Sequence, residues 1–443
     1  MSNSLTKKHN ARSLLKFAMP TIIMTVFMSI YTMVDGIFVA NFVSADALAG
    51  LNLVIPGLSI LVAFSVLISA GGSVVISRKL GEGKEDEARG DLSCIVLLTV
   101  LFGAAVMALA LIFARPILGV LGATENLYSV AYDYYRTLAM FTVPCLLQVQ
   151  FQYFFVTAGA PSLGLVCVVA GGVSNVILDY VFIALLDLGI SGAAMATGIG
   201  YSIPAVVGVV WFAFNKKGLL RFTKPHFSGA ALMESVVNGV ASMIINLAGA
   251  MVTWLYNRVI ILYLGEIGIS AATIVLYARF MFNSVLSGYS SGVAPVISFN
   301  YGKKDYEQVK LLFRTSLKAT IAGSVLVLAV SVLLRDAIVA LFASGDAVLG
   351  DMARRGILLF SFSYLFNGVN TFAATLFSSL SNGKLSAFMA SMNTFVFLIG
   401  AMFILPVLGL GADGVWLAVP AAELLSLFLS VYLLKKKQKE YHY

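Results

Sequence analysis

The sequence predicts an all-α membrane protein that crosses the bilayer many times. Of its 443 residues, 60% are hydrophobic and 11% are charged, and the mean hydropathy is +0.94. Soluble domains carry roughly 25% charged residues. So few charges cannot cover so apolar a core in water, and lipid must therefore be the solvent for most of the surface. The net charge of +8 is spread over short clusters between long apolar runs, which is typical of membrane topology and not of a nucleic-acid-binding surface.

The long apolar runs define the expected spans. A spanning helix needs about 20 apolar residues, and on that criterion the chain contains about twelve spans. Several of them exceed the thickness of the bilayer and are expected to tilt or protrude. The expected spans are 14–43, 53–78, 91–114, 128–157, 162–185, 190–214, 232–263, 272–300, 311–334, 350–379, 385–406 and 411–434.

Lysine and arginine residues indicate the orientation of the chain. If the N-terminus is cytoplasmic, the inner segments collect nearly all basic residues, while the outer loops hold little beyond Arg115 and Arg335. Because positive charge is enriched in cytoplasmic segments, we expect a multi-pass protein of the cell membrane with both termini in the cytoplasm. The inner basic residues include Lys7, Lys8, Arg78, Lys79, Lys216, Lys217, Arg221, Lys224, Lys303, Lys304, Lys384, Lys435, Lys436 and Lys437.

The two halves of the sequence resemble each other. The stretch Gly71–Gly81 realigns with Gly292–Gly302, and Leu188–Ala193 realigns with Leu408–Asp413 at nearly the same offset. Two matches at one offset favour an internal duplication, with an N-lobe at 1–220 and a C-lobe at 221–443. Six spans in each half give both halves the same orientation, and such parallel repeats enclose a cavity where they meet.

Few ionisable residues lie inside the expected spans. A charge at mid-membrane costs at least about 2.5–3.5 kcal/mol on insertion scales, so each of these residues requires an explanation. All three histidines lie outside the spans, which excludes intramembrane Ser-His and His-metal chemistry. The chain also lacks the Gly-rich Lys-Ser/Thr loop of an ATP-driven pump. The five deep charged residues are Asp35, Asp179, Arg258, Arg279 and Glu423.

Two of these acids are expected at one depth in the N-lobe. At 1.5 Å per residue, Asp35 lies about 12 Å and Asp179 about 9 Å below the outer ends of their spans. Asn175 lies one turn from Asp179 on the same helix face, and Thr197 on the sixth span lies about 10 Å deep. Desolvation and mutual repulsion of the two carboxylates favour uptake of a proton or a cation. We therefore expect an ion-coupling site here, and the alternative is a structural hydrogen-bonded network.

The second half departs from this pattern. The positions that match Asp35 are Tyr256 or Asn257, and those that match Asp179 are Ile399 or Gly400. We therefore expect the ion site in the N-lobe alone. Glu423 is the one deep carboxylate of the C-lobe. Two interpretations stay open for it: an ion pair with Arg279 or Arg258, or a position facing the cavity.

These residues resemble the MATE (multidrug and toxic compound extrusion) family over essentially the whole chain. Individually the motifs are moderate signals, but in this order and on this topology they are strong. They are most similar to the DinF and MepA branch. The motifs are Val34–Ala40, Ala47–Gly50 with Pro56, Leu178–Ile183, Pro295–Gly302 and Gly414–Ala418.

The resemblance implies a MATE fold of two pseudo-symmetric six-helix bundles. It also implies an N-lobe site for protons or cations, mapping onto Asp35, Asn175, Asp179 and Thr197, and a bend of the first helix at Pro20. NorM-type members use C-lobe acids on the seventh and tenth spans, which this sequence lacks. The implied function is antiport: inward flow of H⁺, or of Na⁺, drives export of amphipathic, often cationic compounds.

Soft and aromatic side chains are candidates for the substrate cavity. Methionine adapts its shape to varied ligands, and aromatic faces attract cations. The candidates are Met28, Tyr31, Tyr256, Met281, Phe362 and Phe366, although ordinary helix packing explains most such residues. The expected partners are a small amphipathic substrate and membrane lipid. We expect a monomer with no cofactor beyond the transported ion, no metal other than Na⁺ at Asp35 and Asp179, and no nucleic acid.

Two other functional classes, a membrane-embedded enzyme and a lipid flippase, are alternatives to an exporter. A membrane-embedded enzyme is disfavoured, because the spans contain no histidine and no paired acidic Mg²⁺ motif at a helix end. The main alternative is a flippase for lipid-linked oligosaccharide or another lipid. Such flippases carry cationic cavity residues for pyrophosphate, and Arg258 and Arg279 keep this alternative open.

Overall fold

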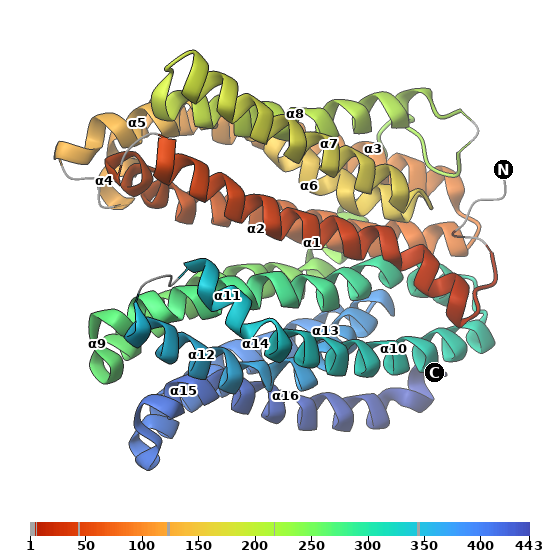
Figure 1. Cartoon of the computed structure of the whole chain (residues 1–443). Coiled ribbons are helices and arrows are strands. Elements are labelled where there is room, and N and C mark those ends of the chain that lie inside the picture. Colours follow the sequence, from red (N-terminus) through yellow and green to blue (C-terminus); the bar gives the residue numbers. More distant parts are fainter. Residues whose placement is uncertain (1–4, 6, 43–44, 122–124, 217, 343–345) are drawn as a thin grey trace. The chain divides into compact units, whose positions relative to one another are not determined.

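The computed structural model describes the chain except residues 1–4, 6, 43–44, 122–124, 217 and 343–345. The side chains of residues 32–50, 52, 122–127, 248–254, 256–257, 266 and 341 also lie outside the description. The described residues form helices joined mostly by short turns, with a longer segment between α8 and α9 (Figure 1). The expectation of an all-helical membrane fold is confirmed.

The helices follow one another in this order: α1 (Ala11–Phe42), α2 (Ala45–Gly81), α3 (Glu85–Ile112), α4 (Ala114–Leu121), α5 (Glu125–Ala139), α6 (Thr142–Thr157), α7 (Pro161–Asp179), the π-helix η1 (Tyr180–Leu185), α8 (Gly189–Phe214), α9 (Gly229–Gly302), α10 (Tyr306–Leu333), α11 (Arg335–Phe342), α12 (Ala347–Ser361), α13 (Ser363–Ser379), α14 (Gly383–Ser391), η2 (Met392–Leu398), α15 (Ile399–Leu405), η3 (Pro406–Leu410) and α16 (Gly411–Tyr441).

The helix lengths agree with about twelve crossings. Within the described residues, nine helical segments are long and apolar enough to span a membrane, or eleven if two bent pairs each count as one span. One of the nine, Gly383–Tyr441, has 59 residues and breaks at Gly409 and Gly411, both with positive φ. Beyond this break α16 packs back against η2 and α15, so the segment accounts for two crossings.

The chain divides into two compact units whose limits fall inside helices. Unit 1 comprises Met1–Lys7 and Phe27–Gly239, and unit 2 comprises Lys8–Val26 and Val240–Tyr443. The boundary therefore lies within α9, some residues after the linker that the sequence suggested, and the first part of α1, with Pro20, belongs to unit 2. Helix α1 continues through Pro20 without interruption.

The internal duplication is visible in the backbone. Left-handed residues, with φ between +56° and +92°, recur in the turns of the two halves at nearly one offset. Such positions favour glycine, yet the second half places a lysine and a serine at two of them. The matching pairs are Gly83 with Lys304, Gly159 with Ser381, and Gly189 with Gly409.

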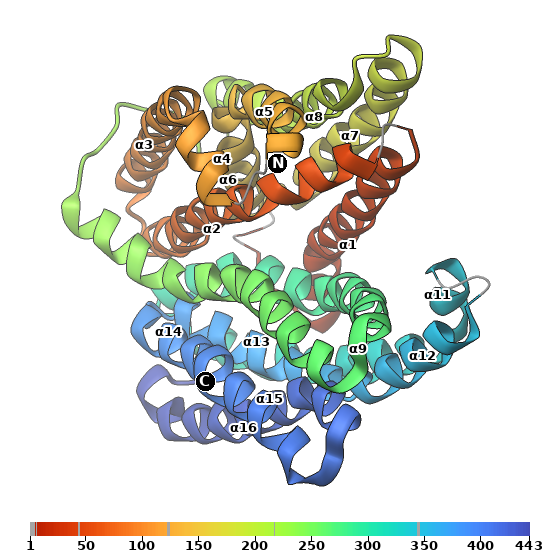
Figure 2. The same ribbon diagram turned by 90° about the vertical axis from the view of Figure 1, so that its left-hand side faces the viewer.

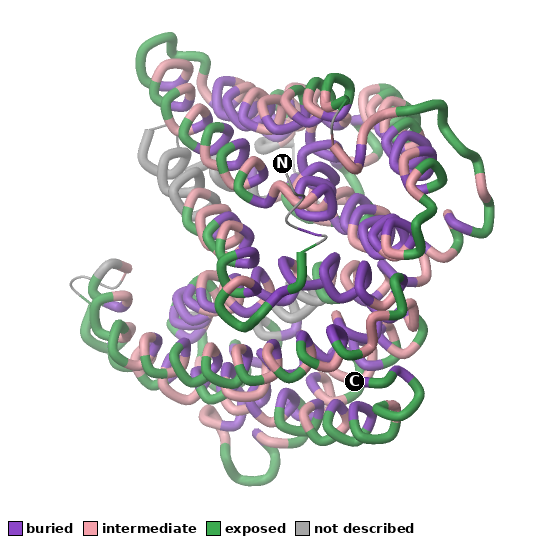
Figure 3. The backbone as a smooth tube through the Cα atoms, turned by 90° about the vertical axis from the view of Figure 1, so that its right-hand side faces the viewer, coloured by how far each residue is buried: buried purple, intermediate pink, exposed green. Residues whose placement is uncertain are grey.

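Exposed and buried positions alternate along the helices (Figure 3), and many of the exposed positions carry large apolar residues, while most buried polar residues are small. On α3, for example, Leu101 is 57% and Ile112 72% exposed, whereas Asp91 and Ser93 are buried. Helices in lipid associate through small and polar residues because lipid itself is apolar. The exposed apolar residues are therefore the surface that contacts the acyl chains.

The basic clusters predict which end of each unit faces the cytoplasm. Lys224 is exposed in the segment between α8 and α9. We expect a cysteine at this position to react with a membrane-permeant maleimide in intact cells and not with an impermeant one. Labelling by the impermeant reagent from outside would reverse the orientation.

Candidate functional site

Two helices of unit 1 cross closely at a pair of glycines. A Cβ atom on Gly171 of α7 would lie 2.6 Å from the carbonyl oxygen of Gly200 on α8, and a Cβ on Gly200 would lie 3.0 Å from the Gly171 oxygen. Only residues without side chains permit such an approach of two backbones. The crossing brings the polar residues on either side of it into contact.

Three of the four expected coupling residues lie together beside this crossing. The Asn175 amide on α7 donates to the Thr197 hydroxyl on α8, with 3.3 Å between Nδ2 and Oγ1. The Asn175 side chain is 1% exposed, and its oxygen Oδ1 has no hydrogen-bond partner among the described residues. Asp179, one turn further along α7, is completely buried. A free acceptor and a buried carboxylate on one helix face suit a proton or a small cation.

Asp179 is also the last residue of α7 before the chain continues as the π-helix η1. Single π-turns inside α-helices occur frequently at functional sites, because the inserted residue re-aims the side chains around it. In unit 1 the change of helix type therefore coincides with the buried acid.

A small cavity opens beside the Asn175–Thr197 pair. It has a volume of about 10 Å³, which is room for about one water molecule. Two residues of α1 that we expected at the substrate cavity, Met28 and Tyr31, line it. Gly172 of α7 provides the space for this helix, since a Cβ there would lie 2.6 Å from the Phe27 ring. Sequence reasoning missed two further polar lining residues, Gln148 and Tyr201.

Two expected site residues cannot be placed. Asp35 lies on α1, but its side chain is outside the described residues, and so is that of Tyr256 on α9. The pairing of Asp35 with Asp179 therefore stays a prediction from span depth. Among the described residues, no group of three His, Cys, Asp or Glu side chains converges as a metal site.

The sequence left two roles open for Glu423, and one of them was an ion pair with Arg279 or Arg258. The structure does not show this ion pair. The Glu423 carboxylate accepts hydrogen bonds from three asparagines of α13 and η2, and Arg258 is exposed. The Arg279 guanidinium instead lies 5.8 Å from the centre of the Phe360 ring, an arrangement that cation–π attraction favours. The asparagines were missed because sequence spacing does not reveal which faces of distant helices meet.

The remaining cavity candidates are spread over unit 2. Phe362 is 45% exposed, while Met281 and Phe366 are half-buried, and none of the three lines either cavity described here. One aromatic of this series, Tyr364, packs edge-on against Phe282. The aromatic residues around Phe362 therefore serve at least in part as helix packing, which is the alternative that the sequence left open.

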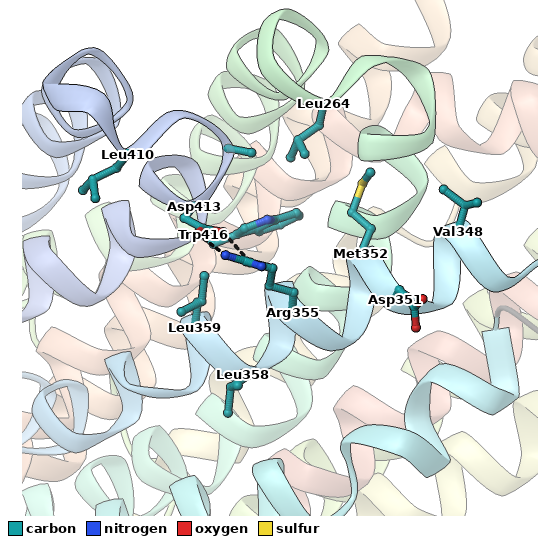
Figure 4. A pocket seen from close by; sticks show the side chains of 11 residues that line it. Leu264, Val348, Asp351, Met352, Arg355, Leu358, Leu359, Leu410, Asp413 and Trp416 are labelled. Atoms are coloured by element: carbon teal, nitrogen blue, oxygen red, sulfur yellow. Dashed lines mark hydrogen bonds and ion pairs between the residues drawn. The ribbon is translucent and has the colours of Figure 1, made fainter.

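A larger cavity of about 840 Å³ lies in unit 2, where α12 and α16 begin (Figure 4). Most of its wall is apolar, and at its rim Arg355 of α12 forms an ion pair with Asp413 of α16. Volumes of about 300–1,000 Å³ are typical of small-molecule sites, which are mostly apolar with a few polar groups. The lining residues are Leu264, Val348, Asp351, Met352, Arg355, Leu358, Leu359, Leu410, Ala412, Asp413 and Trp416.

Comparisons with known proteins agree with this architecture. The MatE family profile matches residues 20–181 and 239–404, two stretches of similar length as a duplication requires. The multidrug export protein MepA of Staphylococcus aureus (strain bovine RF122 / ET3-1) is 23% identical over 96% of this chain and 94% of its own length. MepA of Staphylococcus haemolyticus is also 23% identical, over 95% of this chain and 92% of its own.

Solved structures show the same fold. One is described as the outward-facing conformation of a multidrug resistance MATE family transporter of the MOP superfamily. It superposes with a TM-score of 0.93 at 18% identity and covers 100% of this chain and 99% of its own. The profile match spans most of the chain. The chain thus belongs to the MATE family and is a multi-pass membrane transporter, not an enzyme.

Proposed function

We propose that this transporter exports amphipathic, often cationic drugs or other toxic organic compounds in exchange for inward protons, by alternating access. The observation that carries the proposal is the completely buried acid Asp179, one turn from the Asn175–Thr197 pair inside unit 1. Burying an ionised carboxylate in an apolar span costs free energy, and such residues usually mark ion or substrate pathways. Binding a proton or a cation neutralises the carboxylate and reduces that cost. The name of the MepA relatives, multidrug export protein, supports the choice of substrate class.

Coupling requires that the ion favours one conformation over the other. A ligand shifts an equilibrium only by its differential affinity for the two states. We infer that protonation of Asp179, together with Asp35 on α1, relieves the cost of burying charge and so favours the state in which both acids are dehydrated. Asn175 and Thr197 orient Asp179 and supply oxygen atoms for the ion.

The large cavity of unit 2 suits the substrate class. Its leucine, methionine and tryptophan walls accept an apolar body, and the Arg355–Asp413 pair supplies a polar contact at the rim. In the predicted orientation, both α12 and α16 begin at the outer side of the cell membrane. We therefore assign this cavity to the exit route of the substrate.

Transport in reconstituted vesicles tests the proposal. We expect a pH gradient alone to drive accumulation of a fluorescent organic cation, and a sodium gradient at fixed pH to drive little. The reason is that, among the described residues, no group of three His, Cys, Asp or Glu side chains converges to neutralise a retained metal ion. Accumulation with a sodium gradient alone would show that Na⁺ is the coupling ion. No accumulation with either gradient would show that the export proposal is wrong.

A further inference from the structure

The acid of unit 2 lies in a polar cluster built from three helical elements. Glu423 of α16 is 4% exposed. Its atom Oε1 accepts from Asn367 Nδ2 at 3.0 Å and from Asn393 Nδ2 at 3.2 Å, and Oε2 accepts from Asn370 Nδ2 at 2.8 Å. The Asn370 amide also donates to the backbone carbonyl of Glu423 at 2.8 Å. We call Glu423, Asn367, Asn370 and Asn393 the asparagine cluster.

The cluster leaves the charge of Glu423 uncompensated. Asparagine amides carry no net charge, and the described residues place no lysine, arginine or histidine within ion-pair distance of this carboxylate. The ionisable residues on neighbouring elements contact other groups or face elsewhere. They are Tyr364 on α13, Lys384 on α14, Lys310, Arg314 and Lys318 on α10, Arg354, Arg355 and Asp351 on α12, Arg279 on α9, and, on α16 itself, Asp413, Tyr432, Lys435, Lys436, Lys437, Lys439, Glu440 and Tyr441. A lone buried charge in a membrane span is unfavourable, so the site gains stability by taking up one positive charge.

The asparagine cluster has acceptor positions that are not used by hydrogen bonds and that could contact a proton or a cation. A carboxylate has about four lone-pair positions, and three amide donors occupy three of them here. The Ser430 hydroxyl donates to Asn370 Oδ1 at 2.8 Å, which fixes that amide with its NH₂ group toward Glu423. Asn367 Oδ1, in contrast, is buried and has no hydrogen-bond partner among the described residues. Half a turn of the Asn367 amide would present this oxygen to a carboxylic O–H or to a bound cation.

Both halves have a buried polar contact between the last two of their six spans. In unit 1 the polar contact joins the fifth and sixth spans, from Asn175 to Thr197, and in unit 2 it joins the eleventh and twelfth, from Asn393 to Glu423. Each half also has a π-helix in the first span of its pair, η1 in unit 1 and both η2 and η3 in unit 2. At the repeat offset of 220 residues given by Gly189 and Gly409, Asn393 and Glu423 match positions 173 and 203, so the two clusters lie between equivalent spans but at different positions.

We propose that the asparagine cluster is a second ion site, which binds one proton or one sodium ion at Glu423. The carboxylate neutralises the ion, Asn370 holds the carboxylate in place, and Asn367 and Asn393 turn to supply oxygen atoms. Its acid lies on the twelfth span, in the half where no ion site was expected from the sequence. The proposal concerns binding and does not depend on the substrate or on the coupling role of Asp179.

Ion binding to the purified full-length protein tests this proposal. Binding of ²²Na⁺ is measured at neutral pH, and the carbonyl stretch of protonated carboxyl groups is recorded by infrared difference spectroscopy between neutral and acid pH. The variants are Glu423→Gln, Asn393→Ala and the matched control Glu440→Gln, which removes an acid from the exposed end of the same helix. Elution as a single species in gel filtration qualifies each variant for measurement.

We expect Glu423→Gln to remove one signal, sodium binding if the ion is Na⁺ or the carboxyl band if it is H⁺. Glu440→Gln should change neither. Asn393→Ala keeps the carboxylate and should weaken ion affinity by about 10-fold, as loss of an orienting partner does, so it tests the proposal even if Glu423→Gln fails to fold. If the wild type gives neither signal, or gives signals that Glu423→Gln and Asn393→Ala leave unchanged, the cluster is a structural network and the proposal is wrong. If the wild type gives a signal that the Glu423 and Asn393 variants leave unchanged, that signal belongs to another acid, and the export proposal, which rests on Asp179, stays intact.

Discussion

Asp179→Asn should abolish gradient-driven drug efflux, reducing it to the level of cells without the transporter. Asparagine keeps the size of the side chain and one acceptor oxygen but cannot release and rebind a proton. The link between the gradient and the conformational equilibrium is then lost. We expect the purified variant still to bind a fluorescent cation, because the large cavity is formed by other residues. Efflux in cells and fluorescence binding on the same variant separate coupling from folding.

Asp187→Asn is the matched control for this variant. Asp187 is exposed in the turn after η1 and has φ of 51°, a conformation that asparagine also tolerates. It should transport like the wild type. Asp35→Asn should behave like Asp179→Asn, while Asn175→Ala and Thr197→Ala should weaken coupling less, since they only orient the acid. A variant at Asp179 that still concentrates drug against its gradient would make the unit 1 cluster structural and leave Glu423 as the next coupling candidate.

Of the glycine-to-alanine substitutions in unit 1, Gly71→Ala should lower the stability of the protein most. A Cβ on Gly71 of α2 would lie 1.7 Å from the carbonyl oxygen of Ser235 on α9, and a Cβ on Gly239 would lie 1.8 Å from the Leu67 oxygen. These contacts are with backbone atoms, which cannot move aside as a side chain tip can. We expect each substitution to push the two helices apart. The free energy of unfolding should fall by at least about 1–3 kcal/mol, the usual cost of overpacking a core. The measurement is the midpoint of thermal unfolding in detergent.

Gly57→Ala on the same helix provides the comparison. A Cβ there would meet only Leu121 at 3.9 Å, an ordinary contact. Its unfolding midpoint should stay near that of the wild type, or rise slightly because alanine favours helix over glycine. Equal midpoints for Gly71→Ala and Gly57→Ala would show that α2 and the start of α9 do not pack as described.

The crossing of α2 and α9 also explains why the compact units differ from the two halves that the sequence suggests. The polar linker between α8 and α9 looks like a natural division, with Lys216, Arg221 and Pro225. The first turns of α9 nevertheless pack into unit 1 through Gly71 and Gly239, and the unit ends within the helix. Composition identifies linkers, but only packing decides which bundle a continuous helix joins at each of its ends.

The burial of Asp179 beside Asn175 and Thr197 could be predicted because it depends on few helices, whereas the coupling role of these residues stays a prediction. A carboxylate in an apolar run is rare enough to be noticed, and helix rise places it at a depth without further information. Asn175 followed from its position one turn from Asp179, and Thr197 from its depth. The structure added the glycine crossing at Gly171 and Gly200, which sets the distance between α7 and α8.

The sequence by itself predicted that the protein lies in a membrane, that it crosses the bilayer about twelve times and that its two halves are related by duplication. It also singled out Asp179 and Glu423, which are buried in the structure. These follow from hydropathy, from charge and from spacing along one chain, and none needs the rotation of a helix about its axis. Only the tertiary structure decided what Glu423 touches. Arginine was the obvious partner by charge, but Asn367, Asn370 and Asn393 surround the carboxylate instead. Which side chains meet depends on how α13, η2 and α16 are rotated against each other, and in a membrane that rotation is set by small-residue packing and buried hydrogen bonds, which hydropathy does not encode.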